Sequence, residues 1–261
     1  MKKLLNKPWF YALYCIPQFI MIHSASTASQ DFKNVNACIS DYYLYFYNWF
    51  NYFFLCMYEI IFISFFMVLL IRKEMDCNRV ILYDSTLKLW KNCIKSSVSL
   101  TFIVPIINNI IIGLVAILKH ASVSCNWNEI GSFAKNMMPY FDIKECNLWI
   151  IIILCMFLDI LRLQVALLMI CIIHWLFRKS IIDFFIVYIN VILVNLQGLF
   201  GYYNMNIKCV YKYMIMSQRR VYLYGISIKD NIVVPVFIWS CFFVVSILAF
   251  RFYRKDMLNN Q

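Results

Sequence analysis

Residues 148–177 read LWIIIILCMFLDILRLQVALLMICIIHWLF, and this run decides the fold class. About 20 mostly apolar residues are enough for an α-helix to cross a bilayer. The run is longer than that, which allows tilt or an extension into the headgroup region. It predicts a transmembrane helix that carries two opposite charges, Asp159 and Arg162, in its middle.

The composition extends this interpretation to the whole chain. The protein has 261 residues, of which 63% are hydrophobic and 14% are charged, and its mean hydropathy is +0.71. Soluble domains are about half apolar and about a quarter charged. The net charge is +11, and the basic residues behind it lie between and beside the apolar runs. This placement is typical of residues that set topology and contact anionic lipids. We therefore expect one polytopic membrane domain over residues 1–261. Its expected partner is the lipid bilayer, and we expect no nucleic-acid partner.

The apolar runs predict an all-α fold with six membrane spans. The expected spans are approximately 9–24, 49–71, 96–118, 148–177, 181–202 and 232–250. The first run is followed by SASTASQ and also resembles a cleavable signal peptide. Pro17 interrupts its apolar region, which favours a retained first helix. The aromatic residues just before the second span are typical of an interfacial belt.

Basic residues indicate the orientation. With both termini in the cytoplasm, the inner segments hold 14 Lys and Arg residues and the outer segments hold 9. The positive-inside rule therefore favours cytoplasmic termini. The segment 203–231 weakens the bias with five basic residues, and it either folds back on the membrane or is placed on the wrong side.

The inner segment between the second and third spans contains an expected amphipathic helix, at residues 84–95. At 100° per residue its apolar side chains fall within about 120° of one another and its lysines within about 60°. The apolar sector holds Leu87, Trp90, Cys93 and Ile94, and the basic sector holds Lys88, Lys91 and Lys95. Asp84 or Ser85 is placed to cap its N-terminus. The helix either lies on the inner headgroups or docks a cytoplasmic partner.

The stretch RVILYDSTLKLWKNCIKSSVSL, with Trp90-Lys91 in a Trp-basic position, resembles the inner segment of small six-span permeases of type-2 ABC exporters from Gram-positive bacteria. These include the antimicrobial-peptide immunity and export type. The ending FRFYRKDMLNN also resembles the segment after the sixth span in this family. The chain departs from the pattern before the Trp, where the usual Arg-x-x-Ser-Arg is degraded and Lys88 stands in the region of the second Arg.

The resemblance implies a function and partners. A coupling helix formed by Asp84, Ser85, Leu87, Lys88, Trp90, Lys91, Ile94 and Lys95 would seat in a cleft of an ATPase subunit. Two permease subunits, identical or homologous, would pair above an ATPase dimer that carries ATP and Mg²⁺. The chain would export a peptide or lipid-like substrate from the bacterial cytoplasmic membrane. The residues 203–231 would form short outer helices.

The chain lacks the sequence motifs of an enzyme. It has no GxxxxGK[ST] phosphate loop, no HExxH and no GxSxG. Its three His are far apart, and its 11 Cys show no zinc spacing. We therefore expect no catalytic residue, metal or cofactor on this chain. Cys125 and Cys146 share one outer loop, where a disulfide and two free thiols are both open.

Three charged residues lie in the interior of predicted spans: Glu59, Asp159 and Arg162. Asp183 lies at the inner end of the fifth span near Lys179, where we expect it at the interface. Charged residues in the interior of a span usually face protein or water and pair with each other. The spacing of three places Asp159 and Arg162 on one helical face, and Glu59 is a rival partner for Arg162. The pair either lies on a substrate path or neutralises charge between helices. The alternative functions are a membrane-embedded enzyme using Asp159, Asp183 or Glu59, and a non-catalytic sensor or assembly partner.

Overall fold

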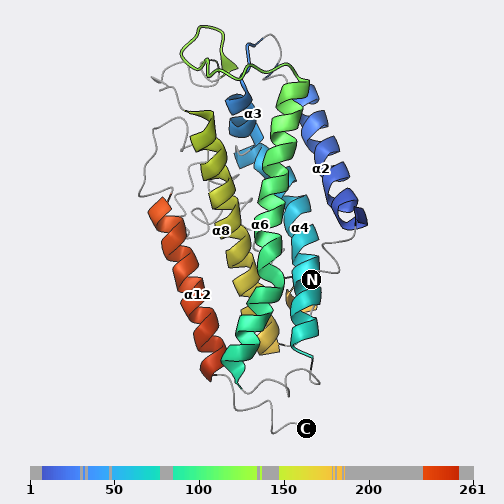
Figure 1. Ribbon diagram of the computed structural model, residues 1–261, viewed down its shortest axis with the longest axis vertical. Coiled ribbons are helices and arrows are strands. Elements are labelled where there is room, and N and C mark those ends of the chain that lie inside the picture. The colour runs from blue at the N-terminus through green and yellow to red at the C-terminus, as the bar shows by residue number, and fades with distance from the viewer. Residues whose placement is uncertain are drawn as a thin grey trace.

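The computed structural model of the protein is a bundle of long helices (Figure 1). It describes residues 8–29, 32, 35–46, 49–76, 85–133, 136, 147–177, 179, 181–183, 185 and 232–252. The named helices are α2 (Pro8–Ala28), α3 (Ile39–Phe46), α4 (Trp49–Glu74), α6 (Thr86–Leu118), α8 (Leu148–Phe177) and α12 (Val234–Phe252). Three of these described helices, α6, α8 and α12, contain segments long and apolar enough to cross a membrane. The expected six-span count goes beyond this finding, because α2 and α4 are not among these three helices and most of residues 181–202 lie outside the described part.

The expected spans agree with the helices to different degrees. The fourth span, 148–177, has the same bounds as α8, and the first, second and sixth fall largely within α2, α4 and α12. The third differs, since α6 begins at Thr86 rather than near residue 96. The amphipathic segment is therefore the first part of one 33-residue helix, not a separate element. At 1.5 Å per residue α6 is about 50 Å long, well beyond the hydrocarbon core.

The described helices run along one axis and leave two chemically different ends (Figure 1). The helices α4, α8 and α12 run towards the end at which α6 begins, while α2 and α6 run away from it. The ring of Trp175 stacks on Phe250 with centroids 4.4 Å apart, which places the C-terminal ends of α8 and α12 together. We call this the basic end and the opposite one the cap end.

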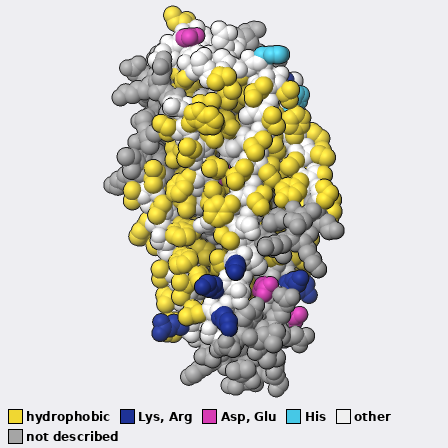
Figure 2. Space-filling view, in the orientation of Figure 1, with side chains coloured by type: hydrophobic (Ala, Val, Ile, Leu, Met, Phe, Trp, Pro, Cys, Tyr) yellow, Lys and Arg dark blue, Asp and Glu magenta, His cyan; other side chains and the backbone are white. Residues whose placement is uncertain are grey.

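Charge separates the two ends. Exposed cations of the basic end are Arg72, Lys73, Lys88, Lys91, Lys95, Lys179 and Arg251. Figure 2 shows a band of hydrophobic side chains over the middle of the bundle and Lys and Arg side chains near its lower end. An exposed apolar band between polar ends is what a membrane-spanning bundle presents to lipid.

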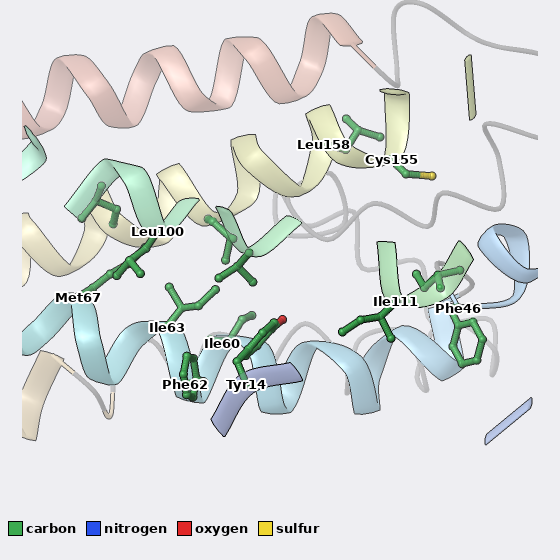
Figure 3. Packing of buried hydrophobic residues seen from close by; sticks show 14 of the residues in the cluster. Tyr14, Phe46, Ile60, Phe62, Ile63, Met67, Leu100, Ile111, Cys155 and Leu158 are labelled. Atoms are coloured by element: carbon green, nitrogen blue, oxygen red, sulfur yellow. The ribbon is translucent and has the colours of Figure 1, made fainter. Parts of the chain in front are cut away.

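The core runs between α2, α4, α6 and α8. Tyr14 of α2 packs on Phe62 of α4 with ring centroids 5.0 Å apart. Further along, Ile63 and Met67 of α4 and Leu100 of α6 are buried in the same cluster (Figure 3). The side chains therefore interdigitate inside the bundle, and the exposed apolar residues form its outer surface.

The cap end is closed by two segments that lie far apart in the sequence, residues 35–46 and 119–133. Isolated bridges join Asn36 to Ser132 and Cys38 to Ser122. The buried Asp41 accepts hydrogen bonds from the Cys38 N–H and from Nε1 of the buried Trp127, each at 2.7 Å. The rings of α3 also differ from the expected interfacial belt, because Tyr42, Tyr43, Tyr45 and Phe46 are buried within the protein.

Candidate functional site

A charged trio lies inside the bundle, formed by Glu59 of α4 with Asp159 and Arg162 of α8. The Nη2 atom of Arg162 lies 2.6 Å from Glu59 Oε2 and 3.4 Å from Asp159 Oδ1. Glu59 and Asp159 are 0% and 1% exposed, and Arg162 is 9% exposed. The structure thus brings together the three intramembrane charges, and the rival partner Glu59 makes the shorter contact.

Helix geometry explains why the trio forms. Asp159 and Arg162 are three residues apart and therefore share one face of α8. That face meets α4, where Glu59 is buried beside Ile60 and Ile63. Removing one partner of a buried ion pair costs roughly 3–5 kcal/mol, because it leaves an uncompensated buried charge. The trio therefore joins α4 to α8 at this level of the bundle.

A group of neutral polar side chains extends the polar region towards α2 and α6. The Tyr14 hydroxyl donates to Asn108 Oδ1 at 2.7 Å, and Gln18 Nε2 donates to the same oxygen at 3.2 Å. Tyr14, Gln18 and Asn108 are almost fully buried. Tyr14 also interacts electrostatically with Glu59, Asp159 and Arg162. These three side chains connect α2 and α6 to the region of the trio.

Part of this group could be expected from the sequence: Asn108 is a polar residue inside a predicted span, which favours interhelical hydrogen bonds. Tyr14 and Gln18 were not expected there. Gln18 sits in an otherwise apolar run next to Pro17, and an isolated amide in such a run was the signal available. Tyr14 carried no such signal, because tyrosine is common at membrane interfaces.

The start of α6 holds the residues expected to form a coupling helix. Asp84 lies outside the described residues, and Ser85 is the N-cap, accepting a hydrogen bond from the Lys88 N–H at 3.2 Å. Lys88, Lys91 and Lys95 are exposed, as the amphipathic pattern predicts. Cys93 is buried and Ile94 is half-buried against the core. Leu87 belongs to the expected apolar sector, but its side chain is 43% exposed instead of buried.

Trp90 faces the neighbouring helix α12. Its Nε1 donates to Ser246 Oγ at 3.1 Å, and its ring meets Phe243 edge-on with centroids 5.3 Å apart. Trp90 therefore joins the start of α6 to α12 and does not share the exposed face of the lysines.

A second buried polar pair lies near the basic end. His174 Nδ1 is 2.5 Å from Asp183 Oδ2, and both side chains are buried. Asp183 lies close to Lys179 in the chain, as expected, but its side chain is fully buried in this pair and not exposed at the surface. The pair follows from a turn of the chain after α8 that brings residues nine apart together. Among the described residues, no group of three His, Cys, Asp or Glu side chains is arranged to hold a metal ion.

The cysteines of the cap end are thiols. Cys38 is buried, Cys125 is half-buried, and both are free. Burial raises the pKa of Cys38 to about 12, so this thiol stays protonated and unreactive at neutral pH. Cys146, the other member of the possible disulfide, lies outside the described residues.

Comparison with known proteins leaves the site to be interpreted from its own geometry, since no family model, curated protein or solved structure matches the chain.

Proposed function

We propose that the chain is the membrane-spanning permease subunit of an ABC exporter that moves a peptide or lipid-like substrate. A separate ATPase dimer would hydrolyse the ATP, and a second permease subunit, identical or homologous, would complete the path. The resemblance of the inner segment and of the C-terminal ending to type-2 permeases supports this assignment. So does the bundle itself, which combines apolar crossing helices with buried polar groups of the kind that mark transport paths.

The observation that carries the proposal is the construction of α6. Its first turns present Lys88, Lys91 and Lys95 at the basic end, and the same helix continues to Leu118 at the cap end. A force applied at the start of a continuous helix acts on the helix as a whole. Trp90 would pass that displacement to α12 through its contacts with Ser246 and Phe243. In this proposal the coupling element is the first part of the long helix α6 and not a separate surface helix.

The charge distribution supports a cytoplasmic position for the basic end. Cytoplasmic segments of membrane proteins carry an excess of Lys and Arg, and the exposed cations of α4, α6 and α12 gather there. With a cytoplasmic basic end, α12 ends on the inner side and α2 runs away from that side (Figure 1), which fits the proposal that both termini are cytoplasmic in a bacterial membrane. α8 and α12 both run towards the basic end (Figure 1). A return crossing between them is what the six-span arrangement requires.

Charge reversal at the start of α6 tests the proposal. The tagged chain, purified from its native membranes, should retain an ATPase subunit. The combined change Lys88→Glu, Lys91→Glu and Lys95→Glu should release that subunit, because the docking surface changes sign. The matched control, Arg72→Glu with Lys73→Glu, changes cations of the same end on α4 and should retain it.

Two results would refute the assignment. One is the absence of any ATPase subunit from the purified wild-type chain. The other is equal retention in the α6 variant and in the control, which would show that the lysines contact only lipid.

A membrane-embedded enzyme is the second candidate, and the buried pair of His174 and Asp183 favours it. A histidine oriented by a carboxylate is a common general base. Turnover by the purified chain without ATP, lost on Asp183→Asn or Asp159→Asn, would support this candidate against the exporter.

A further inference from the structure

Two carboxyl groups share one guanidinium in the interior of the bundle. Glu59 Oε2 and Asp159 Oδ1 both contact Nη2 of Arg162, at 2.6 and 3.4 Å. The shared nitrogen keeps the two carboxyl groups within a few ångströms of each other. Like charges held this close in a low-dielectric interior oppose each other's ionisation.

The charges of the trio are unequal. Arginine stays protonated in proteins, so Arg162 neutralises one carboxylate and not two. Among the described residues, α2 brings the titratable phenol of Tyr14 near the trio, and Asn108 of α6 accepts the hydrogen bond of that phenol. A surplus carboxylate in a membrane interior is costly, and neutralisation is the usual response of such a group.

The surrounding polar atoms offer the hydrogen-bonding partners that a bound proton needs. Glu59 Oε1 is buried and makes no hydrogen bond to a described residue, and the same holds for Gln18 Oε1 and Asn108 Nδ2. These atoms include both acceptors and a donor. Tyr14 is hydrogen-bonded to Asn108 and interacts with the charges of the trio, so these atoms belong to one polar region.

We propose that the charged trio is a proton-binding site inside the membrane, which holds one proton on the Glu59 and Asp159 carboxyl pair. The two groups interact strongly, so the proton belongs to the pair and not to one residue. The ligand is a proton and not a metal ion, because the guanidinium occupies the position between the carboxylates at which a cation would bind. The site follows from the trio alone and does not depend on the proposed exporter function.

Counting protons tests the site. The purified full-length chain in lipid nanodiscs is studied at neutral pH by infrared spectroscopy, which detects the carbonyl stretch of a protonated carboxyl group and its shift in D₂O. The wild type should contain one such group in the trio. Glu59→Gln and Asp159→Asn should each contain none, because one carboxylate then faces one guanidinium. Arg162→Gln should contain two.

A control variant isolates the trio from other buried carboxyl groups. Asp41 and Asp183 are also buried, and their contribution is common to every variant and cancels in the differences. Glu129→Gln removes an exposed carboxyl group at the cap end and should leave the band unchanged. Circular dichroism of each variant establishes that it is folded. If Arg162→Gln does not fold, the comparison of Glu59→Gln and Asp159→Asn with the wild type decides the question.

Three results would overturn the proposal. The first is a band of equal area in the wild type, Glu59→Gln and Asp159→Asn, which would mean that both carboxylates are ionised. The second is an Arg162→Gln band no larger than that of the wild type, together with a Glu59→Gln or Asp159→Asn band that is no smaller. The third is a wild-type band that is present in choline chloride and disappears in sodium chloride, which would make the ligand a sodium ion.

Discussion

The contact of Trp90 with α12 gives the sharpest quantitative prediction. Trp90→Phe keeps a ring against Phe243 and removes the donor to Ser246 Oγ. A single side-chain hydrogen bond of this kind contributes about 1 kcal/mol, and about 0.6 kcal/mol on average between membrane helices. Trp90→Phe and Ser246→Ala should therefore each lower the free energy of unfolding by roughly 1 kcal/mol. Trp90→Ala should cost about 2–3 kcal/mol, less than a fully buried tryptophan, because the side chain is half-buried.

A double-mutant cycle checks this prediction by unfolding in mixed micelles of increasing denaturing-detergent content. The double variant Trp90→Phe/Ser246→Ala should cost about as much as either single one, with a coupling energy of roughly 0.5–1 kcal/mol. Trp149 is 68% exposed at the start of α8 and serves as the control, since Trp149→Phe should change little. Strict additivity of the two changes would refute the hydrogen bond between Trp90 and Ser246.

Three further predictions concern the helix caps and the cap end. Ser85→Ala should cost about 1 kcal/mol by removing the N-cap of α6, measured by the same unfolding assay, and Ser85→Asp should restore it. His120 has a left-handed φ of 59° at the end of α6, so His120→Gly should stabilise the protein by about 0.5–1 kcal/mol, whereas His120→Ala should not. Burial raises the pKa of Asp41 above 3.8, and the hydrogen bonds from Cys38 and Trp127 offset this only in part. The folded state then binds a proton more tightly than the unfolded one, so its contribution to stability is full below pH 3.8 and falls as the pH rises through the raised pKa. Asp41→Asn should flatten this dependence when unfolding is followed across pH, and an identical pH profile in the variant would contradict the assignment.

Hydropathy predicted α8 to the residue because that run is apolar up to both of its ends, with its two charges in the middle, so that helix and predicted span coincide there. In α6 they do not coincide. The polar-to-apolar change near Ser96 marks where lipid begins, but no Gly or Pro interrupts the helix between Thr86 and Pro105. Periodicity therefore placed the lysines on the exposed face, while hydropathy placed the start of the helix about ten residues late.

The sequence alone could not predict contacts between residues that lie far apart in the chain. The pattern grouped Trp90 with Ile94 and Cys93 but contained no information about Ser246, which lies 156 residues away. The same holds for Asp41 and Trp127 at the cap end, which are separated by 86 residues. Glu59 was the exception, because a charge inside a span requires a partner and few candidates existed.

The polar contacts give the bundle its internal organisation. Apolar side chains alone specify helix pairing poorly in lipid, because the lipid tails are as apolar as the side chains. Tyr14 and Gln18 join α2 to α6, Trp90 joins α6 to α12, and Glu59 joins α4 to α8 through Arg162. These directional bonds place α2 and α12 with α6, and α4 with α8. Apolar contacts add to these bonds: Leu100 of α6 and Leu163 of α8 belong to the common core, and Trp175 of α8 stacks on Phe250 of α12. A displacement that begins at Ser85 would therefore reach α2 and α12 through the polar contacts of α6, while α12 also stays packed against α8.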